Sequence, residues 1–417
     1  MLAASIGSKV FNQFQRQLPP LLLKASPNLL REASVSTNPI SRHFSSSADI
    51  PKIISGYGDT AHLPLVIQDA YTRPKDPKTI AFDKIGFTAI NTSHLFVAKW
   101  ESDKGWNPGA VVEYGRLGIS VASGVAYGQT LFEGCKAFRK EDGSVVIFRV
   151  EENAKRLQTG ARRLGMPEVP ESMFIQAVID TVKANQAYIP PATVPEASLY
   201  IRPVLVATGN LMGVKRDETY ALSVIVTPVG PYWPGGKITP ITLQTTIDYR
   251  RAFDGGVGHI KAGGNYAPGI MPASLAKEKG HSEVLYLSQG KNGKEYVEEA
   301  GAANVAMILP NNTLVFAHSP SILPGVTRDS VMTLAKEIGI TVEFRPIELS
   351  ELITANQIFC MGTAAGVTPV GGIALPNGEV KTFATHEDSL TNILRKALDA
   401  ARSGKDGINR GWHRQVS

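Results

Sequence analysis

The sequence predicts a two-domain protein of mixed α/β class, and three of its features support that prediction. Its 417 residues suffice for two or three domains. Runs of β-branched residues alternate with segments whose apolar residues recur at helical spacing. The densest interior cluster of proline and glycine, residues 230–236, marks a linker. We therefore expect a small N-terminal domain at 46–229, a linker at 230–237 and a large domain at 238–417, with a small-molecule site in the cleft between the domains.

The individual elements follow from the spacing of apolar residues. Strands are expected where β-branched or alternating runs end at turn residues: Ala110–Leu117, Val145–Val150, Ser198–Ala207, Ala221–Val229, Ile241–Ile247, Val284–Leu287, Val305–Leu309 and Thr341–Phe344. Helices are expected where apolar residues recur every three to four positions: Glu151–Leu164, 267–280, 327–338 and 387–402. No internal repeat interrupts this order.

The first 45 residues differ from the rest in composition. They are rich in Ser, Ala and Leu, and they hold five basic residues against one acidic residue, within a net charge of +6 for the whole chain. This composition predicts an organelle transit peptide at 1–45, the alternative being a disordered tail. The Arg42–Ser45 pattern resembles mitochondrial processing sites and favours the mitochondrion over the plastid. The remaining chain is close to neutral without a dense Lys/Arg run, so no nucleic-acid partner is expected.

Cysteine usage and hydropathy exclude several other classes. Cys135 and Cys360 are the only cysteines and lie far apart, so neither a disulfide framework nor a cysteine-rich zinc site is expected, and no metal site is predicted. This usage fits a reducing compartment. No stretch approaches the roughly 20 unbroken apolar residues of a membrane helix, so no membrane partner is expected.

The glycine-rich segment Gly255–Tyr266 is the most informative part of the chain. Lys261 lies within it, and no Asp or Glu occurs from Gly255 to Lys277. A lysine among Gly, Ala and Ile is poorly solvated, which lowers its pKa and makes its amine nucleophilic, as Schiff-base chemistry requires. The alternative is a glycine loop with a solvated surface lysine. The glycines do not form a dinucleotide fingerprint, because no G-x-G-x-x-G follows a strand with an acid about 20 residues on.

Two further segments are candidates for presenting backbone N–H groups to an anion. In Ile322–Ser330 a Pro-Gly pair precedes a helix pattern, so the helix start at Val326 and Thr327 offers free N–H groups, the positive end of the helix dipole and a hydroxyl. An ordinary capped helix is the alternative. In Cys360–Gly366 a turn of small residues follows a strand-like run, and a plain tight turn is the alternative there.

Glu298 and Glu299 enter an apolar strand. A carboxylate buried there requires a cationic partner, and a protonated pyridine nitrogen would be such a partner. Solvated acids at the start of a strand are the alternative, and this alternative suits Glu298 better than Glu299.

Four motifs, whose order and spacing agree, resemble the fold-type IV pyridoxal-phosphate enzymes, and among these the branched-chain-amino-acid aminotransferases of the eukaryotic type. The motifs are Leu131–Phe138, Tyr200–Pro203, Lys261–Tyr266 and Leu323–Arg328, and the resemblance runs from about residue 80 to 415. It implies a small and a larger α/β domain with pyridoxal 5'-phosphate in the cleft. It also implies ping-pong transamination between Leu, Ile or Val and 2-oxoglutarate.

The resemblance further implies which residues bind the cofactor. Lys261 corresponds to the lysine that binds pyridoxal phosphate covalently and moves the substrate proton. Glu299 corresponds to the acid at the pyridine nitrogen, which keeps the ring an electron sink, and Tyr266 to the residue at the phenolic oxygen. The cofactor phosphate would be bound by Arg156, Val326, Thr327 and Thr363.

On the substrate side, the resemblance implies an apolar wall for the branched side chains, formed by Tyr127, Phe132 and Tyr200. Arg202 would meet the second carboxylate of glutamate, and the Thr363–Ala364 backbone would take the α-carboxylate. A homodimer is expected, with part of the pocket supplied by the second subunit.

The chain departs from the family at two points. Animal mitochondrial members carry a CxxC pair where this chain has Ala365 and Thr368, so thiol regulation of that kind is not expected. Members commonly have Thr where this chain has Ala302, which removes one polar contact expected at the substrate.

Two alternatives stand beside this interpretation. Within the same fold, a D-amino-acid aminotransferase or an aminodeoxychorismate lyase is the nearest alternative. The long Tyr127–Phe138 motif and the Tyr200-x-Arg202 pattern favour the branched-chain enzyme over both. A non-catalytic protein of the same fold is the other. Such a protein would be expected to lose Lys261 or Glu299, and both are present.

Overall fold

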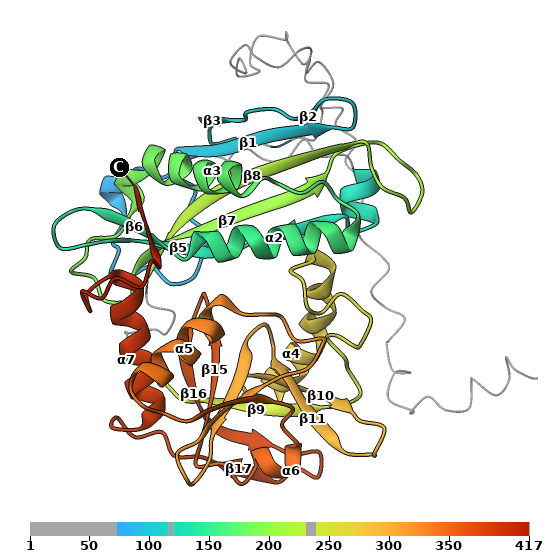
Figure 1. Ribbon diagram of the computed structural model, residues 1–417, viewed down its shortest axis with the longest axis vertical. Helices are drawn as coiled ribbons and strands as arrows, with labels where there is room; N and C mark the ends of the chain where they lie inside the picture. The colour runs from blue at the N-terminus through green and yellow to red at the C-terminus, as the bar shows by residue number, and fades with distance from the viewer. Residues whose placement is uncertain (1–72, 116, 118–120, 231–238, 417) are drawn as a thin grey trace, which may run out of the picture. The chain divides into compact units, whose positions relative to one another are not determined.

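The computed structural model describes residues 73–115, 117, 121–230 and 239–416. The expected transit peptide at 1–45 and, apart from residue 230, the expected linker at 230–237 lie outside these residues. Within the described residues the chain forms two nine-stranded sheets with helices packed against them (Figure 1). The mixed α/β class predicted from the sequence is therefore confirmed.

The first sheet is antiparallel throughout its described strands. These are β1 (His94–Glu101), β2 (Gly105–Trp106), β3 (Ala110–Glu113), β4 (Thr130–Phe132), β5 (Cys135–Arg139), β6 (Val145–Phe148), β7 (Ser198–Ala207), β8 (Thr219–Val229) and β18 (His413–Val416). Their order is β18-β6-β5-β7-β8-β1-β2, with β3 beside β1 and β4 beside β7. The longest ladder joins β7 and β8, whose branched side chains suit a pleated, buried surface.

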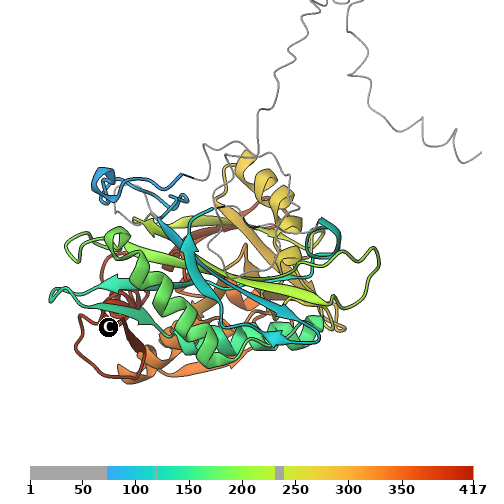
Figure 2. The same cartoon turned by 90° about the horizontal axis from the view of Figure 1, so that it is seen from above.

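Helices α2 (Val150–Leu164) and α3 (Glu171–Ala184) pack against this sheet (Figure 1) and against each other (Figure 2). Leu157 of α2 and Phe174 of α3 are buried in one cluster with Leu199 of β7. Burial of each such side chain contributes about 1.5–3 kcal/mol. Helix α2 ends at Gly165, whose φ of 66° allows the left-handed cap in which its N–H bonds back to the last turn.

The second sheet is mixed. Its strands are β9 (Ile241–Thr246), β10 (Glu283–Gln289), β11 (Glu295–Ala300), β12 (Asn304–Ile308), β13 (Leu314–Ala317), β14 (Val342–Arg345), β15 (Gln357–Gly362), β16 (Gly366–Ala374) and β17 (Val380–Thr382). Their order is β11-β10-β9-β16-β15-β12-β13-β14, with β17 beside β16. The β9–β10, β9–β16 and β13–β14 pairs are parallel, and the other pairs are antiparallel.

Helices α5 (Val326–Glu337) and α7 (Leu390–Ser403) contact each other. In the second sheet, α5 contacts β14 and β15, α7 contacts β15 and β16, α4 (Ile270–Glu278) contacts β10 and α6 (Leu349–Leu352) contacts β11. Short helical turns occur at η2 (Pro77–Thr79), η4 (Gln186–Tyr188), η6 (Gly263–Asn265) and η7 (Ala267–Gly269), and a π-helical turn at η3 (Val121–Ala126). No helix in the described residues is long and apolar enough to cross a membrane.

Several predicted bounds differ from the observed ones for local reasons. The strand predicted at Ser198–Ala207 has these bounds, but the strand predicted at Ala110–Leu117 ends at Glu113. The helix predicted at 387–402 begins later, at Leu390, because the Ser389 side chain accepts the Asn392 N–H as an N-cap.

The last strand was not predicted. β18 pairs with β6 of the first sheet, with His413 opposite Phe148. The end of the chain thus joins the first sheet, although it lies in the range expected for the large domain. The division of the chain into the two expected domains stays a prediction.

Candidate active site

Lys261 is held against strand β4 of the first sheet. Its carbonyl oxygen accepts the Phe132 N–H at 3.1 Å. A Cβ atom on Gly263 would lie 2.7 Å from Thr130 Cγ2, so this approach of the two backbones requires glycine. The glycine-rich segment is therefore a packed connection rather than a free loop.

The Lys261 amine is partly buried beside two aromatic rings. Its Nζ donates to Tyr266 Oη at 3.0 Å and lies 4.5 Å from the centroid of the Phe132 ring. Burial lowers the pKa of Lys261 to about 8, with Arg156 acting in the same direction and Glu133 opposing it. An amine with this pKa has a substantial uncharged fraction near neutral pH and can serve as nucleophile or base. Burial also raises the pKa of Tyr266, so its phenol stays protonated.

A buried ion pair lies beside the lysine. Arg156 Nε and Nη2 donate to the two carboxylate oxygens of Glu133 at 2.7 and 2.8 Å, and Nη1 donates to the Pro324 carbonyl at 3.0 Å. Burial on its own raises the pKa of Glu133, but Arg156 brings it below its ordinary value. A guanidinium has five N–H donors, and these bonds use three of them. Two donors of Arg156 are left for another acceptor, such as a phosphate oxygen.

Glu299 is buried in β11 and is held by two side chains. Arg251 Nη2 lies 2.5 Å from Glu299 Oε2, and Asn304 Nδ2 donates to Oε1 at 2.8 Å. Burial raises the pKa of Glu299, and the Arg251 guanidinium opposes this effect. Asn304 also donates to the Leu323 carbonyl at 3.0 Å, which connects Glu299 to the segment that precedes α5.

Glu298 is buried as well, which corrects the expectation of a solvated acid. Its side chain is 5% exposed, and its Oε2 accepts the hydroxyls of Ser319 at 2.9 Å and Ser321 at 2.5 Å. These hydroxyls replace the water that a buried carboxylate loses. The Ser321 carbonyl in turn accepts a hydrogen bond from Arg251 Nη2 at 2.9 Å. Arg251 therefore contacts both Glu299 and a serine that binds Glu298.

Arg202 packs between two aromatic rings. Its Cζ lies 4.8 Å from the Phe132 centroid and 5.2 Å from that of Tyr200, and its Nη2 donates to Tyr200 Oη at 3.1 Å. Its Nε is buried without a partner among the described residues. A Cβ on Gly134 would lie 2.2 Å from Tyr200 Oη, so the tyrosine fits only beside glycine. An arginine with a spare donor can bind a carboxylate while the rings offer apolar surface.

A cavity next to this cluster contains expected anion-binding residues. It is lined by Gly134, Cys135, Lys136, Phe148, Asn153, Val326, Thr327, Thr363 and Arg402. Val326 and Thr327 are the first residues of α5, where free N–H groups and the positive end of the helix favour an anion. Thr363 begins the turn between β15 and β16. The structure thus brings three of the four residues expected at the phosphate to one cavity.

Tyr127 is placed differently from the other expected substrate residues. It follows η3, and its side chain is 41% exposed. Among the described residues, no hydrogen bond or ring contact joins it to Phe132 or Tyr200. The described residues also contain no group of three or more His, Cys, Asp or Glu side chains that would hold a metal ion.

Sequence reasoning did not single out Glu133, Lys136 or Arg251. Glu133 and Lys136 flank or interrupt apolar strands, and a charge in such a place must find a partner because leaving it unpaired is costly. That signal was available for both. Arg251 carries no comparable signal, because it follows another arginine in a polar connection.

Comparison with known proteins identifies the family. Residues 130–373 match the family described as Amino-transferase class IV. The chain is 37% identical over 352 residues to branched-chain amino acid aminotransferase 2, chloroplastic, of Humulus lupulus, covering 84% of this chain and 85% of that protein. It is 36% identical over 338 residues to branched-chain amino acid aminotransferase 1, mitochondrial, of the same organism, covering 81% and 84%.

Solved structures agree with this assignment. The branched-chain amino acid aminotransferase of Thermobaculum terrenum in its PLP-form has a TM-score of 0.63 and 25% identity, covering 78% of this chain and 99% of that chain. The chain belongs to the class IV aminotransferase family. Within it, the chain is similar to branched-chain enzymes of plants, as the sequence motifs indicate.

Proposed function

We propose that the chain catalyses reversible amino-group transfer between a branched-chain L-amino acid (Leu, Ile or Val) and 2-oxoglutarate, giving the branched-chain 2-oxo acid and L-glutamate. The observation that carries this proposal is the partly buried Lys261 amine, with its lowered pKa and the Tyr266 hydroxyl at 3.0 Å. The plant relatives named for branched-chain amino acids, which match over most of both chains, support the substrate class.

We propose pyridoxal 5'-phosphate as the cofactor, the group named for the Thermobaculum terrenum enzyme. The residues present fit it. Lys261 would bind it covalently, Tyr266 would contact its phenolic oxygen, and Glu299 would contact its pyridine nitrogen. Its phosphate would meet the spare donors of Arg156 and the N–H and hydroxyl groups of Val326, Thr327 and Thr363. When bound, this group supplies a sink for the electrons left by breaking a bond at the substrate Cα.

Residues of the chain itself then move the proton of the substrate Cα and limit the access of water to the site. With the cofactor bound, the Lys261 Nζ would take the proton from the substrate Cα and pass it to the cofactor within the first half-reaction. In the second half-reaction it would carry a proton the opposite way, to the Cα of the second substrate. Taking up a proton requires an uncharged amine. The lowered pKa makes that form accessible near neutral pH. The Phe132 and Tyr266 rings around Nζ limit the access of water.

The substrate pocket has an apolar wall for the branched side chain, formed by the rings of Phe132, Tyr200 and Tyr127. Arg202, whose buried Nε has no partner among the described residues, binds the second carboxylate of glutamate or 2-oxoglutarate. The backbone of Thr363–Ala364 takes the α-carboxylate. One pocket thereby serves an aliphatic and an acidic substrate in turn.

The proposal is tested by assaying the purified protein, loaded with pyridoxal phosphate, with L-leucine and 2-oxoglutarate. We expect equal amounts of 4-methyl-2-oxopentanoate and L-glutamate. Parallel incubations with D-alanine and 2-oxoglutarate, and with aminodeoxychorismate alone, cover the two alternatives of the same fold. Turnover of either, without turnover of L-leucine, would replace the substrate and leave the fold assignment in place.

The pKa of Lys261 predicts how covalent uptake of the cofactor depends on pH. Attachment requires the uncharged amine, and burial lowers the pKa of this amine to about 8. The rate at which the apoprotein takes up pyridoxal phosphate should therefore rise with pH and level off above about 8. An exposed lysine would keep the rate rising towards about 10.4. Stopped-flow absorbance over this pH range measures the rate, and a rate still rising at the upper end would contradict the assigned environment.

We propose that the protein is a homodimer whose second subunit completes the pocket. Large apolar side chains that are more than half exposed support this proposal: Val125, Met212, Val214, Phe253, Ile270, Met271 and Ile408. Exposed apolar surface of this extent is typical of a subunit interface. Sedimentation analysis of the active protein should give twice the mass of one chain. A monomer with full activity would refute the proposal.

We propose that the protein acts in the mitochondrion, directed there by residues 1–45, with the plastid as the alternative. The curated relatives include mitochondrial and chloroplastic forms, so they do not separate the two. A fusion of residues 1–45 to a fluorescent protein, expressed in plant cells beside markers of both organelles, tests this. Fluorescence confined to plastids, or spread through the cytosol, would contradict it.

A further inference from the structure

The turn between β15 and β16 presents unused backbone donors. Gly362 and Gly366 pair across the hairpin and leave Thr363, Ala364 and Ala365 as the turn. Among the described residues, the N–H groups of Ala364 and Ala365 have no hydrogen-bond acceptor. Unpaired N–H groups at a cavity wall are donors available to an anion.

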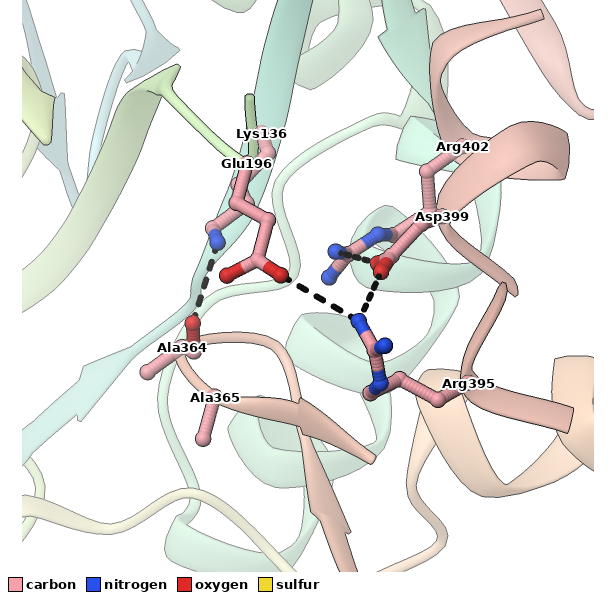
Figure 3. A pocket seen from close by; sticks show the side chains of 7 residues that line it. All are labelled: Lys136, Glu196, Ala364, Ala365, Arg395, Asp399 and Arg402. Atoms are coloured by element: carbon pink, nitrogen blue, oxygen red, sulfur yellow. Dashed lines mark hydrogen bonds and ion pairs between the residues drawn. The ribbon is translucent and has the colours of Figure 1, made fainter. Parts of the chain in front are cut away.

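One side chain of the first sheet holds this turn. Lys136 of β5 is 5% exposed, and its Nζ donates to the Ala364 carbonyl oxygen at 3.0 Å, as Figure 3 shows. In a trans peptide the carbonyl and the following N–H point in opposite directions. A lysine that fixes the direction of the Ala364 carbonyl therefore also fixes the direction of the Ala365 N–H, which points away from the lysine.

Charged side chains on two other elements surround Lys136. Figure 3 shows Glu196, from the connection before β7, paired with Arg395 of α7 at 3.3 Å. Arg395 also pairs with Asp399 of the same helix at 3.3 Å, and Asp399 pairs with Arg402. None of these side chains forms a hydrogen bond with Lys136 among the described residues, and the hydrogen bond of its Nζ goes to the Ala364 carbonyl of the turn.

Burial lowers the pKa of Lys136 to about 7, with Arg402 acting in the same direction and Asp399 and Glu196 opposing it. An ammonium and a neutral amine both carry N–H donors. Lys136 can therefore donate to the Ala364 carbonyl at pH values below and above this pKa, so its contact with the turn does not depend on its protonation state.

We propose that Lys136 is a positioning residue for substrate binding: it orients the Ala364–Ala365 peptide so that the N–H groups of the turn receive the α-carboxylate shared by all substrates. This inference rests on the proposed function, because that function places the α-carboxylate at the turn. Lys136 acts through the turn and does not touch the reacting atoms. Its loss should therefore weaken binding of every carboxylate substrate to a similar degree and leave the chemical step in place.

The test compares Lys136→Met with Lys136→Arg, and uses Lys183→Met on the exposed last turn of α3 as a control. For the methionine variant we expect KM for both L-leucine and 2-oxoglutarate to rise roughly tenfold to a hundredfold, the range for losing a charge-assisted hydrogen bond. The inhibition constant of 4-methylpentanoate, which is leucine without its amino group, should rise by the same factor. We expect kcat to stay within about threefold of wild type, with unchanged absorbance of the bound cofactor.

The arginine variant should recover most of the affinity, because a guanidinium also donates to the carbonyl, and the control should match wild type. Equal inhibition constants in wild type and Lys136→Met would overturn the inference, as would a loss confined to kcat or to cofactor content. Should Lys136→Met fail to fold by circular dichroism, Lys136→Leu, which also lacks an N–H donor, replaces it and is expected to show the same rise in KM. Wild-type turnover of leucine tests the proposed function separately, and if another amino acid is the substrate, the same comparison applies to it.

Discussion

Lys261→Ala should lower the rate of transamination between L-leucine and 2-oxoglutarate by roughly 10³-fold or more. The substitution removes both the covalent anchor of the cofactor and the base for the substrate proton, and in the part of the chain that the structure describes no other lysine forms a hydrogen bond with Tyr266 Oη. The rate is measured under saturating pyridoxal phosphate, so that weaker cofactor binding does not by itself explain the loss.

Lys277→Ala is the matched control for this substitution. Lys277 is exposed in the last turn of α4 and lies outside the site, so its loss should leave the rate unchanged. Borohydride reduction followed by mass spectrometry should find pyridoxal phosphate on Lys261 in wild type and on no residue in Lys261→Ala. Attachment of pyridoxal phosphate to another lysine, with activity retained in Lys261→Ala, would show that Lys261 is not the lysine that binds the cofactor.

Glu133→Ala should lower the free energy of unfolding by about 3–5 kcal/mol, the usual cost of breaking a buried ion pair by removing one partner. Glu133 is fully buried, and its carboxylate binds both Nε and Nη2 of Arg156. Without it, the Arg156 charge stays buried and loses two of its three recorded bonds. Urea denaturation of the apoprotein, followed by circular dichroism, measures the change without any contribution from bound cofactor.

Glu152→Ala, in the same helix as Arg156, is the control for charge loss. Glu152 pairs with Lys155 on the exposed face of α2, where solvent screens the interaction, so the denaturation midpoint should not move. A midpoint shift for Glu133→Ala no larger than that of Glu152→Ala would mean that the buried pair adds nothing to stability. Loss of the ion pair should also leave the Arg156 side chain less firmly held, so that its two unused N–H donors are no longer fixed in place. We therefore expect the Glu133→Ala variant to bind pyridoxal phosphate more weakly.

Much of the candidate site could be predicted because its signals are local. The Lys261 segment combines glycines with an absence of acids over a short stretch, and this composition predicts a lowered lysine pKa. The start of α5 is also local, since a Pro-Gly pair followed by helical spacing sets where free N–H groups occur. The composition did not identify the distant residues that produce the environment of Lys261, which are the Phe132 ring and Arg156.

The charged contacts could not be predicted in the same way, because they depend on where distant segments meet. Arg156 and Glu133 are 23 residues apart, on helix α2 and in the connection between β4 and β5, and the Lys136 bond to Ala364 spans 228 residues. Glu298 shows the consequence most clearly. Its position at a strand suggested solvation, and it is buried because Ser319 and Ser321 return to supply hydroxyls.

Strand β18 sets a constraint on how the protein is made. It pairs with β6, and Arg414 bonds to Glu151 across 263 residues of sequence. At a synthesis rate of about 5–20 residues per second, β6 waits roughly 13–50 s on the ribosome for its partner. During that time its outer edge presents unpaired N–H and C=O groups, which are a template for aggregation. The outermost strand of the first sheet is thus supplied by residues that are synthesised long after β6, so we expect the edge of β6 to need shielding until β18 is made.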